Sequence, residues 1–115
     1  AGAAGLLGQF VTAAVGPAWR PDPIVLQTVA SLRAGLGVPD VGLSARQHRR
    51  RFARSVGYGP KLFERICRLE RFTDQMSDEP LATLAVRLGY ADQAHLTRDC
   101  VALTGSTPAR LRAAA

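Results

Sequence analysis

The apolar positions of this chain fall at helical spacing in several separate segments. Residues 24–34, 62–76 and 81–88 each repeat apolar side chains at intervals of three and four, as a helix with one buried face does. Between them, residues 34–42 carry three glycines and a proline, which predicts a loop. No segment gives a convincing strand pattern, so we predict an all-α fold.

One further helical pattern occurs twice, 48 positions apart. Residues 43–60 (LSARQHRRRFARSVGYGP) align without a gap on residues 91–108 (ADQAHLTRDCVALTGSTP). Each copy begins with a polar residue, Ser44 or Asp92, and closes with Gly-x-x-Pro. We therefore predict two helices of about three turns, each begun by a side-chain oxygen and ended by glycine.

The two copies present different faces to the core and to solvent. At 100° per residue, His48, Phe52 and Val56 share one face of the first helix. The opposite face and its flanks carry Arg46, Gln47, Arg50 and Arg54, with Arg49 and Arg51 at the edges. In the second copy Leu96, Cys100 and Leu103 point inward, while Gln93, Ala94, His95 and Arg98 lie outside or on the shoulder.

Positive charge is concentrated around the first copy. The whole chain has a net charge of +6, whereas residues 44–71 hold nine Lys or Arg against Glu64 and Glu70, a local charge of +7. Such a field attracts polyanions, either nucleic acid or an anionic membrane. The dominance of arginine and the scarcity of exposed aromatic residues favour phosphate recognition.

The remaining chemistry excludes several classes of protein. Cys67 and Cys100 have no C-x-x-C spacing and no histidine pair, so we expect two buried thiols and no metal or other cofactor. We find no nucleophile with a His–Asp arrangement around it and expect no enzyme. No apolar run reaches the length of a membrane span, and the start lacks the basic region of a signal peptide. We expect a cytoplasmic protein.

Residues 81–105 (LATLAVRLGYADQAHLTRDCVALTG) have the order helix, tight turn, helix, with Gly89 at the turn. We expect Ser77 or Asp78 to cap the first of these helices, with Pro80 in its first turn. This is the layout of a helix-turn-helix, whose second helix enters the major groove of DNA.

These residues resemble a known family. Residues 87–112 (RLGYADQAHLTRDCVALTGSTPARLR) look like the second helix-turn-helix and terminal signature of AraC/XylS-type transcriptional regulators. Residues 43–72 are similar to that family's first recognition helix and linker helix. The resemblance implies two helix-turn-helix subdomains, joined by a long linker helix, that bind adjacent major-groove segments of double-stranded DNA. It also implies transcription regulation, often through RNA polymerase, and an upstream effector-binding or dimerisation domain.

The expected division of the chain is 1–23 as a linker or the tail of an upstream domain, 24–60 as the first helix-turn-helix, 61–76 as the linker helix, and 77–115 as the second helix-turn-helix with a terminal helix. By position, the resemblance places base reading on Arg46, Arg49 and Arg50 and on Gln93, Ala94, Thr97 and Arg98. Gln47 and His95 are further candidates for DNA contact, and Arg54 and Lys61 are expected on backbone phosphates.

One departure from the repeat is visible in the sequence. Shifting residues 81–90 back by 48 positions places them on residues 33–42 (RAGLGVPDVG), where glycine and proline forbid a helix. The first subdomain is therefore expected to lack its supporting helix, either because it is shortened there or because a mobile loop is missing from this sequence. A rival interpretation follows, in which a degenerate helix-turn-helix domain binds a protein and reads DNA weakly or not at all.

Overall fold

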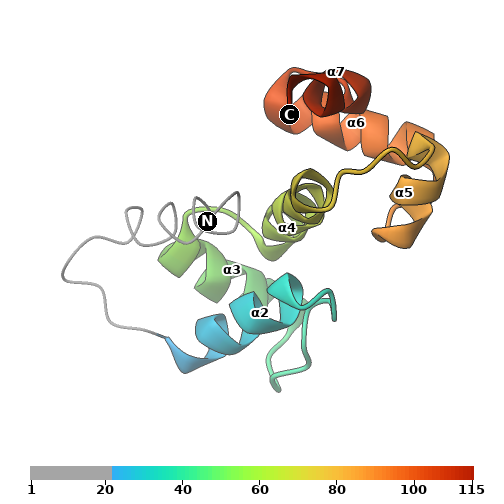
Figure 1. Ribbon diagram of the computed structural model, residues 1–115. Coiled ribbons are helices and arrows are strands. Elements are labelled where there is room, and N and C mark those ends of the chain that lie inside the picture. The colour runs from blue at the N-terminus through green and yellow to red at the C-terminus, as the bar shows by residue number, and fades with distance from the viewer. Residues whose placement is uncertain (1–21) are drawn as a thin grey trace. The chain divides into compact units, whose positions relative to one another are not determined.

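A computed structural model describes residues 22–115, which form six helices and contain no strand (Figure 1). The predicted all-α fold is confirmed. The expected linker or tail at residues 1–23 lies outside the described residues except for its last two, and Pro23 already begins a helix. The chain divides into two compact units between Cys67 and Arg68.

The described part of the first unit contains α2 (Pro23–Arg33), α3 (Ala45–Val56) and the beginning of α4 (Pro60–Asp74). Phe52 and Phe63 meet edge to face with ring centroids 5.6 Å apart, a favourable aromatic geometry. Both rings are fully buried. The buried residues of this core are Val25, Leu32, Phe52, Val56, Phe63 and Cys67.

Helix α3 begins and ends where the repeat predicts. The Ser44 hydroxyl accepts a hydrogen bond from the Gln47 backbone N–H, and the Gln47 side chain accepts one from the Ser44 N–H. This reciprocal pair is a capping box, which satisfies N–H groups that the first helical turn leaves without partners. At the other end Gly57 adopts a φ of 101°, a left-handed conformation that residues with a Cβ adopt at a cost.

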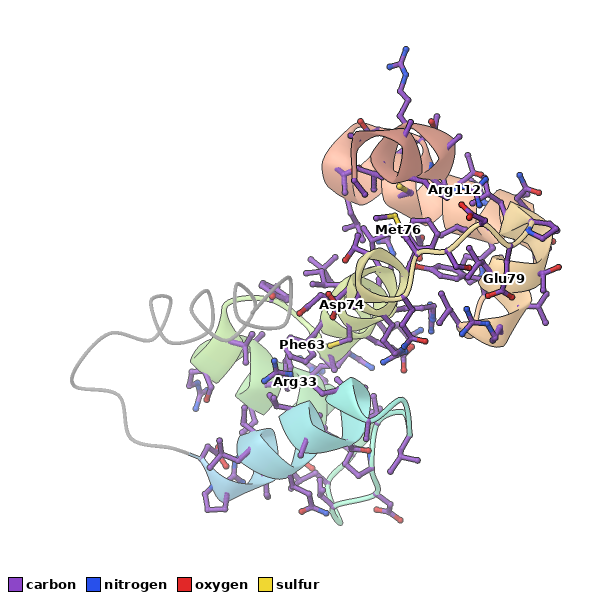
Figure 2. All side chains as sticks on the ribbon, in the orientation of Figure 1. Arg33, Phe63, Asp74, Met76, Glu79 and Arg112 are labelled. Atoms are coloured by element: carbon purple, nitrogen blue, oxygen red, sulfur yellow. The ribbon has the colours of Figure 1, made fainter. Side chains whose placement is uncertain are left out.

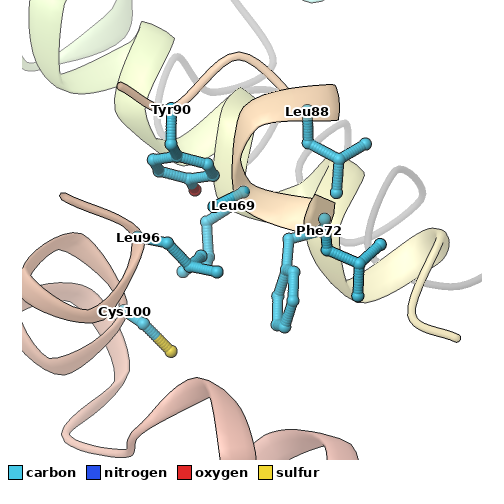
Figure 3. Close-up of a cluster of buried hydrophobic side chains, with 8 residues drawn as sticks. Leu69, Phe72, Leu88, Tyr90, Leu96 and Cys100 are labelled. Atoms are coloured by element: carbon cyan, nitrogen blue, oxygen red, sulfur yellow. The ribbon is translucent and has the colours of Figure 1, made fainter. Parts of the chain in front are cut away.

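The second unit contains the rest of α4 together with α5 (Leu81–Arg87), α6 (Gln93–Thr104) and α7 (Pro108–Ala114). Figure 3 shows its core, in which side chains from α4, α5 and α6 meet. The buried members are Leu69, Phe72, Leu84, Ala85, Leu88, Tyr90, Leu96 and Cys100. As predicted, α6 is capped by Asp92, which accepts from the His95 N–H, and ends at Gly105.

The terminal helix α7 closes this unit. Thr107 caps it and Pro108 occupies its first position, as the sequence indicates. From the same helix the Arg112 guanidinium donates to the carbonyl oxygens of Ser77 at 3.2 Å and Glu79 at 2.6 Å (Figure 2). Helix α7 is thereby tied to the segment that leads into α5.

Two predicted boundaries are wrong. Helix α5 begins at Leu81, after Pro80 at the cap position, and no side chain caps it, so neither Ser77 nor Asp78 has that role. The Ser77 hydroxyl is turned to Glu79 instead, since it donates to that carboxylate at 3.0 Å. Helix α4 spans Pro60–Asp74, and not the expected 61–76.

Between α2 and α3 the first unit has no counterpart of α5, as the shifted sequence predicts. Residues 34–44 contain turns and bends and no helix. Gly35, Gly37 and Gly42 all take positive φ there, which a helix excludes. The core of the unit is nevertheless closed, because Leu32 and Phe52 have no exposed surface and Val56 is 1% exposed.

Candidate nucleic-acid interface

In the second unit, α5 and α6 are joined by a turn of the kind that a helix-turn-helix needs. Gly89 has a φ of 97°, and the Tyr90 N–H donates back to the Ala85 carbonyl at 2.9 Å. The chain thus turns sharply within a few residues and enters α6 at Asp92. The tight turn predicted at Gly89 is confirmed.

Most of the α6 side chains that are expected to reach DNA lie on the outer face of this helix. Gln93, Ala94 and Arg98 are exposed, and Thr97 is half-buried beside them. On the opposite face Leu96 and Cys100 have no exposed surface. The core therefore fixes which side of α6 faces outward.

His95 makes contacts within its own turn. Its Nδ1 accepts a hydrogen bond from the Ala91 N–H at 3.1 Å, and its ring meets the Tyr90 ring edge to face at 5.1 Å between centroids. Its Nε2 lies 3.7 Å from Asp99 Oδ2. These contacts hold the imidazole at the start of α6, half-buried.

A buried polar group beneath α6 was not predicted from the sequence. Asp99 is 7% exposed and Tyr90 is 3% exposed, and the Arg68 guanidinium lies 5.5 Å from the centre of the Tyr90 ring. Burial, and then the charge of Asp99, raise the pKa of Tyr90. The available signal was the position of Asp99, four residues after His95 and next to the inward Cys100.

The outer face of α3 is a row of cationic side chains. Arg46, Arg49, Arg50 and Arg54 are all exposed, as is Lys61 in the first turn of α4. Among the residues that the structure describes, no hydrogen bond or ion pair engages these four guanidinium groups. Gln47 is exposed as well, with its amide oxygen occupied by the capping box.

Two polar contacts hold the other side of α3 against α2. The Thr28 hydroxyl lies 2.7 Å from His48 Nε2, and both side chains are buried. His48 is thus a core histidine, as expected from its position on the inner face. At the edge, Arg51 Nε donates to Asp22 Oδ2 at 2.6 Å. This hydrogen bond is the largest cause of the lowered pKa of Asp22.

A hollow of about 290 Å³ lies along α3. It opens to solvent and is lined by Leu43, Gln47, Arg50, Arg51 and Arg54.

Residues 39–114, about two thirds of the chain, match a family described as a helix-turn-helix domain. The match runs from the loop before α3 to the last turn of α7. This is an AraC-type helix-turn-helix protein. Neither the curated proteins nor the solved structures gave a match.

The AraC-type assignment covers both helices that carry the candidate residues, α3 and α6, and starts after α2. The family is one of DNA-binding domains and not of enzymes, which supports a DNA-binding regulatory function for this chain in general terms. Within residues 22–115, no group of three or more His, Cys, Asp or Glu side chains is placed to hold a metal ion. In the same part of the chain, every helix is too short or too polar to cross a bilayer.

Proposed function

We propose that this AraC-type domain binds double-stranded DNA with α3 and α6 in adjacent major-groove segments and so regulates transcription. The observation that carries the proposal is the repeated design of the two helices. Each has a side-chain cap at its N-terminus, a buried inner face and an exposed arginine at the same repeat position, Arg50 in α3 and Arg98 in α6. Sharing of all three features is expected if both helices are recognition helices.

On α6, short side chains at the N-terminal end leave room for close approach to base edges. Arg98 suits a bidentate contact with guanine, and Gln93 suits adenine. Ala94 is small enough to touch a thymine methyl group, and Thr97 borders the same face. His95 contacts the DNA from the shoulder of the helix while its Nδ1 holds the turn.

On α3, Arg46, Arg49 and Arg50 are assigned to bases and Arg54 to the sugar-phosphate backbone. Lys61 adds a backbone contact from the first turn of α4. The capping box of Gln47 leaves its amide nitrogen as the donor for DNA. We further propose a cytoplasmic setting, contact with RNA polymerase and an upstream effector or dimerisation domain, all in keeping with the AraC type.

The two assigned roles can be separated by measurement. Arg98→Ala should relax discrimination at one base pair by about 1–3 kcal/mol, because a bidentate base contact is lost. Lys61→Ala should weaken all sequences alike and lower the slope of log K against log salt by about 0.9, the value for one phosphate. Both are measured by fluorescence anisotropy on a duplex selected from a random pool and on its single-base variants. Arg110→Ala, at an exposed position of α7, is the matched control.

The base-reading role of Arg98 would be refuted if Arg98→Ala weakened every duplex by the same factor. A second candidate function rests on the missing counterpart of α5, namely a degenerate domain that binds a protein. Salt titration of the wild-type chain with random duplex DNA separates the two functions. Binding with a steep salt dependence supports the main proposal, whereas no binding even at low salt favours the second.

A further inference from the structure

The two copies of the repeat differ at the position occupied by Arg51 in α3 and Asp99 in α6. The Asp99 side chain is 10% exposed, whereas that of Arg51 is 42% exposed. The second unit has α5 to pack against α6, and the first unit has loop in its place. The hollow of about 290 Å³ on α3 borders this open position.

The lining of the hollow is suited to an anion. Arg50, Arg51 and Arg54 contribute three guanidinium groups, and none of the five lining residues is acidic. Arg51 uses its Nε–H on Asp22, which fixes the plane of the guanidinium. Since a guanidinium has five N–H groups, its Nη atoms still have donors for a second acceptor.

The same lining is unsuited to a protein helix that would replace the missing one. Such a helix needs an apolar surface to pack on, and among the described residues that line the hollow Leu43 is the one apolar side chain. The core beneath is already closed, with Phe52 fully buried and Val56 1% exposed. The occupant should therefore be a small, strongly charged group.

We infer that this hollow holds one backbone phosphate of the bound duplex between Arg51 and Arg54. In a helix-turn-helix the first helix crosses the DNA backbone. Here that helix is absent, and the two guanidinium groups take over its contact with the phosphate. Guanidinium binds phosphate oxygens in pairs, so each arginine supplies geometry as well as charge. This inference rests on the proposed DNA binding. It adds Arg51 to the residues that contact the DNA backbone and names the hollow as the place where one phosphate binds.

The test compares Arg54→Gln and Arg51→Gln with Arg110→Gln, a control that removes an equal charge from α7. The first measurement is the salt dependence of binding to the selected duplex. Each hollow variant should lower the slope of log K against log salt by about 0.9 relative to wild type. Arg51→Gln also loses the hydrogen bond to Asp22, the residue that caps α2. Arg54→Gln is therefore the variant that measures the loss of one phosphate contact without disturbing α2.

The second measurement is ethylation interference, which neutralises single phosphates of the duplex. One phosphate should weaken wild type and Arg110→Gln when it is ethylated and leave Arg54→Gln unaffected. Arg54→Lys should recover the salt slope but not the full affinity, because it keeps the charge and loses the paired hydrogen bonds.

The inference is overturned if wild type binds the duplex while Arg54→Gln behaves as Arg110→Gln does in both measurements. Failure of wild type to bind any duplex would instead reject the proposed function. A titration with inorganic phosphate tests whether the hollow binds a free anion instead of a phosphate of the DNA backbone. The NMR signals of the Arg51 and Arg54 Nε–H groups are followed as phosphate is added. If they shift and saturate at millimolar phosphate, and ethylation of no single duplex phosphate weakens binding through Arg54, the hollow binds a free anion and the backbone contact is overturned.

Discussion

The hydrogen bond between Thr28 and His48 gives a sharp test of what holds α3 in place. Thr28 Oγ1 donates its single proton to the Ile24 carbonyl at 2.8 Å, so its oxygen accepts from His48 Nε2–H at 2.7 Å. Thr28→Val keeps the shape and removes the acceptor. His48 is 5% exposed, and its N–H would then be buried without a partner.

The cost follows from that desolvation. A buried donor left without an acceptor costs about 1–3 kcal/mol, so Thr28→Val should destabilise the chain by that amount. For a domain near this size, each kcal/mol lowers the melting temperature by roughly 4–8 °C. His48→Leu copies Leu96, the equivalent residue of the second unit. It leaves Thr28 bonded to Ile24, so the change should stay within about 1.5 kcal/mol.

The double variant Thr28→Val/His48→Leu tests whether the stability lost in Thr28→Val comes from the unpaired N–H of His48. It places a valine against a leucine, with no polar group to satisfy, and should recover most of the stability that Thr28→Val loses. Urea unfolding followed by circular dichroism gives the four free energies of the cycle. A coupling energy below about 0.5 kcal/mol, which is the error of additivity, would refute the reasoning.

Two further predictions concern the chain around α3. Gly57→Ala should destabilise by about 1–2 kcal/mol in thermal unfolding, since Gly57 has a φ of 101°. Gly59→Ala is its control and should be neutral or slightly stabilising, because a Cβ there meets nothing within 4 Å and the φ is not positive; equal losses would contradict the backbone argument. The hydrogen bond from Arg51 lowers the pKa of Asp22, so its stabilisation exists above the unfolded pKa of about 3.9 and is lost as pH falls through the folded value. The difference in free energy of unfolding between wild type and Asp22→Asn should therefore be constant near neutral pH and vanish in acid. A difference that grew as the pH fell would contradict the lowered pKa of Asp22.

The sequence was sufficient to predict the helices whose ends are set locally. Ser44 and Asp92 cap α3 and α6, and Gly57 and Gly105 end them, because these side chains and this φ preference act within one turn. The missing helix was also predictable, since glycine and proline act through their own backbone. The match over residues 39–114 confirms the family that the motifs suggested.

Contacts between distant or alternative partners could not be predicted in this way. Ser77 has a carboxylate two residues away that competes for its hydroxyl, so the expected cap did not form. His48 is satisfied by Thr28, 20 residues earlier, and no local pattern identifies that partner. The burial of Asp99 depends on how α6 packs. Whether Arg46 and its neighbours contact DNA stays a prediction.

The first helix of a helix-turn-helix usually has two roles: it covers the core and it crosses the DNA backbone. In the first unit the core is closed without such a helix, so the first role does not need it. Phe52, Val56 and Phe63 share one buried cluster with residues of α2 and α4, and no residue between 34 and 44 belongs to that cluster. Insertions into that segment should therefore cost little stability, as in any exposed loop rich in glycine. Grafting residues 81–89 into it should therefore change the surface beside α3 and leave the buried cluster as it is.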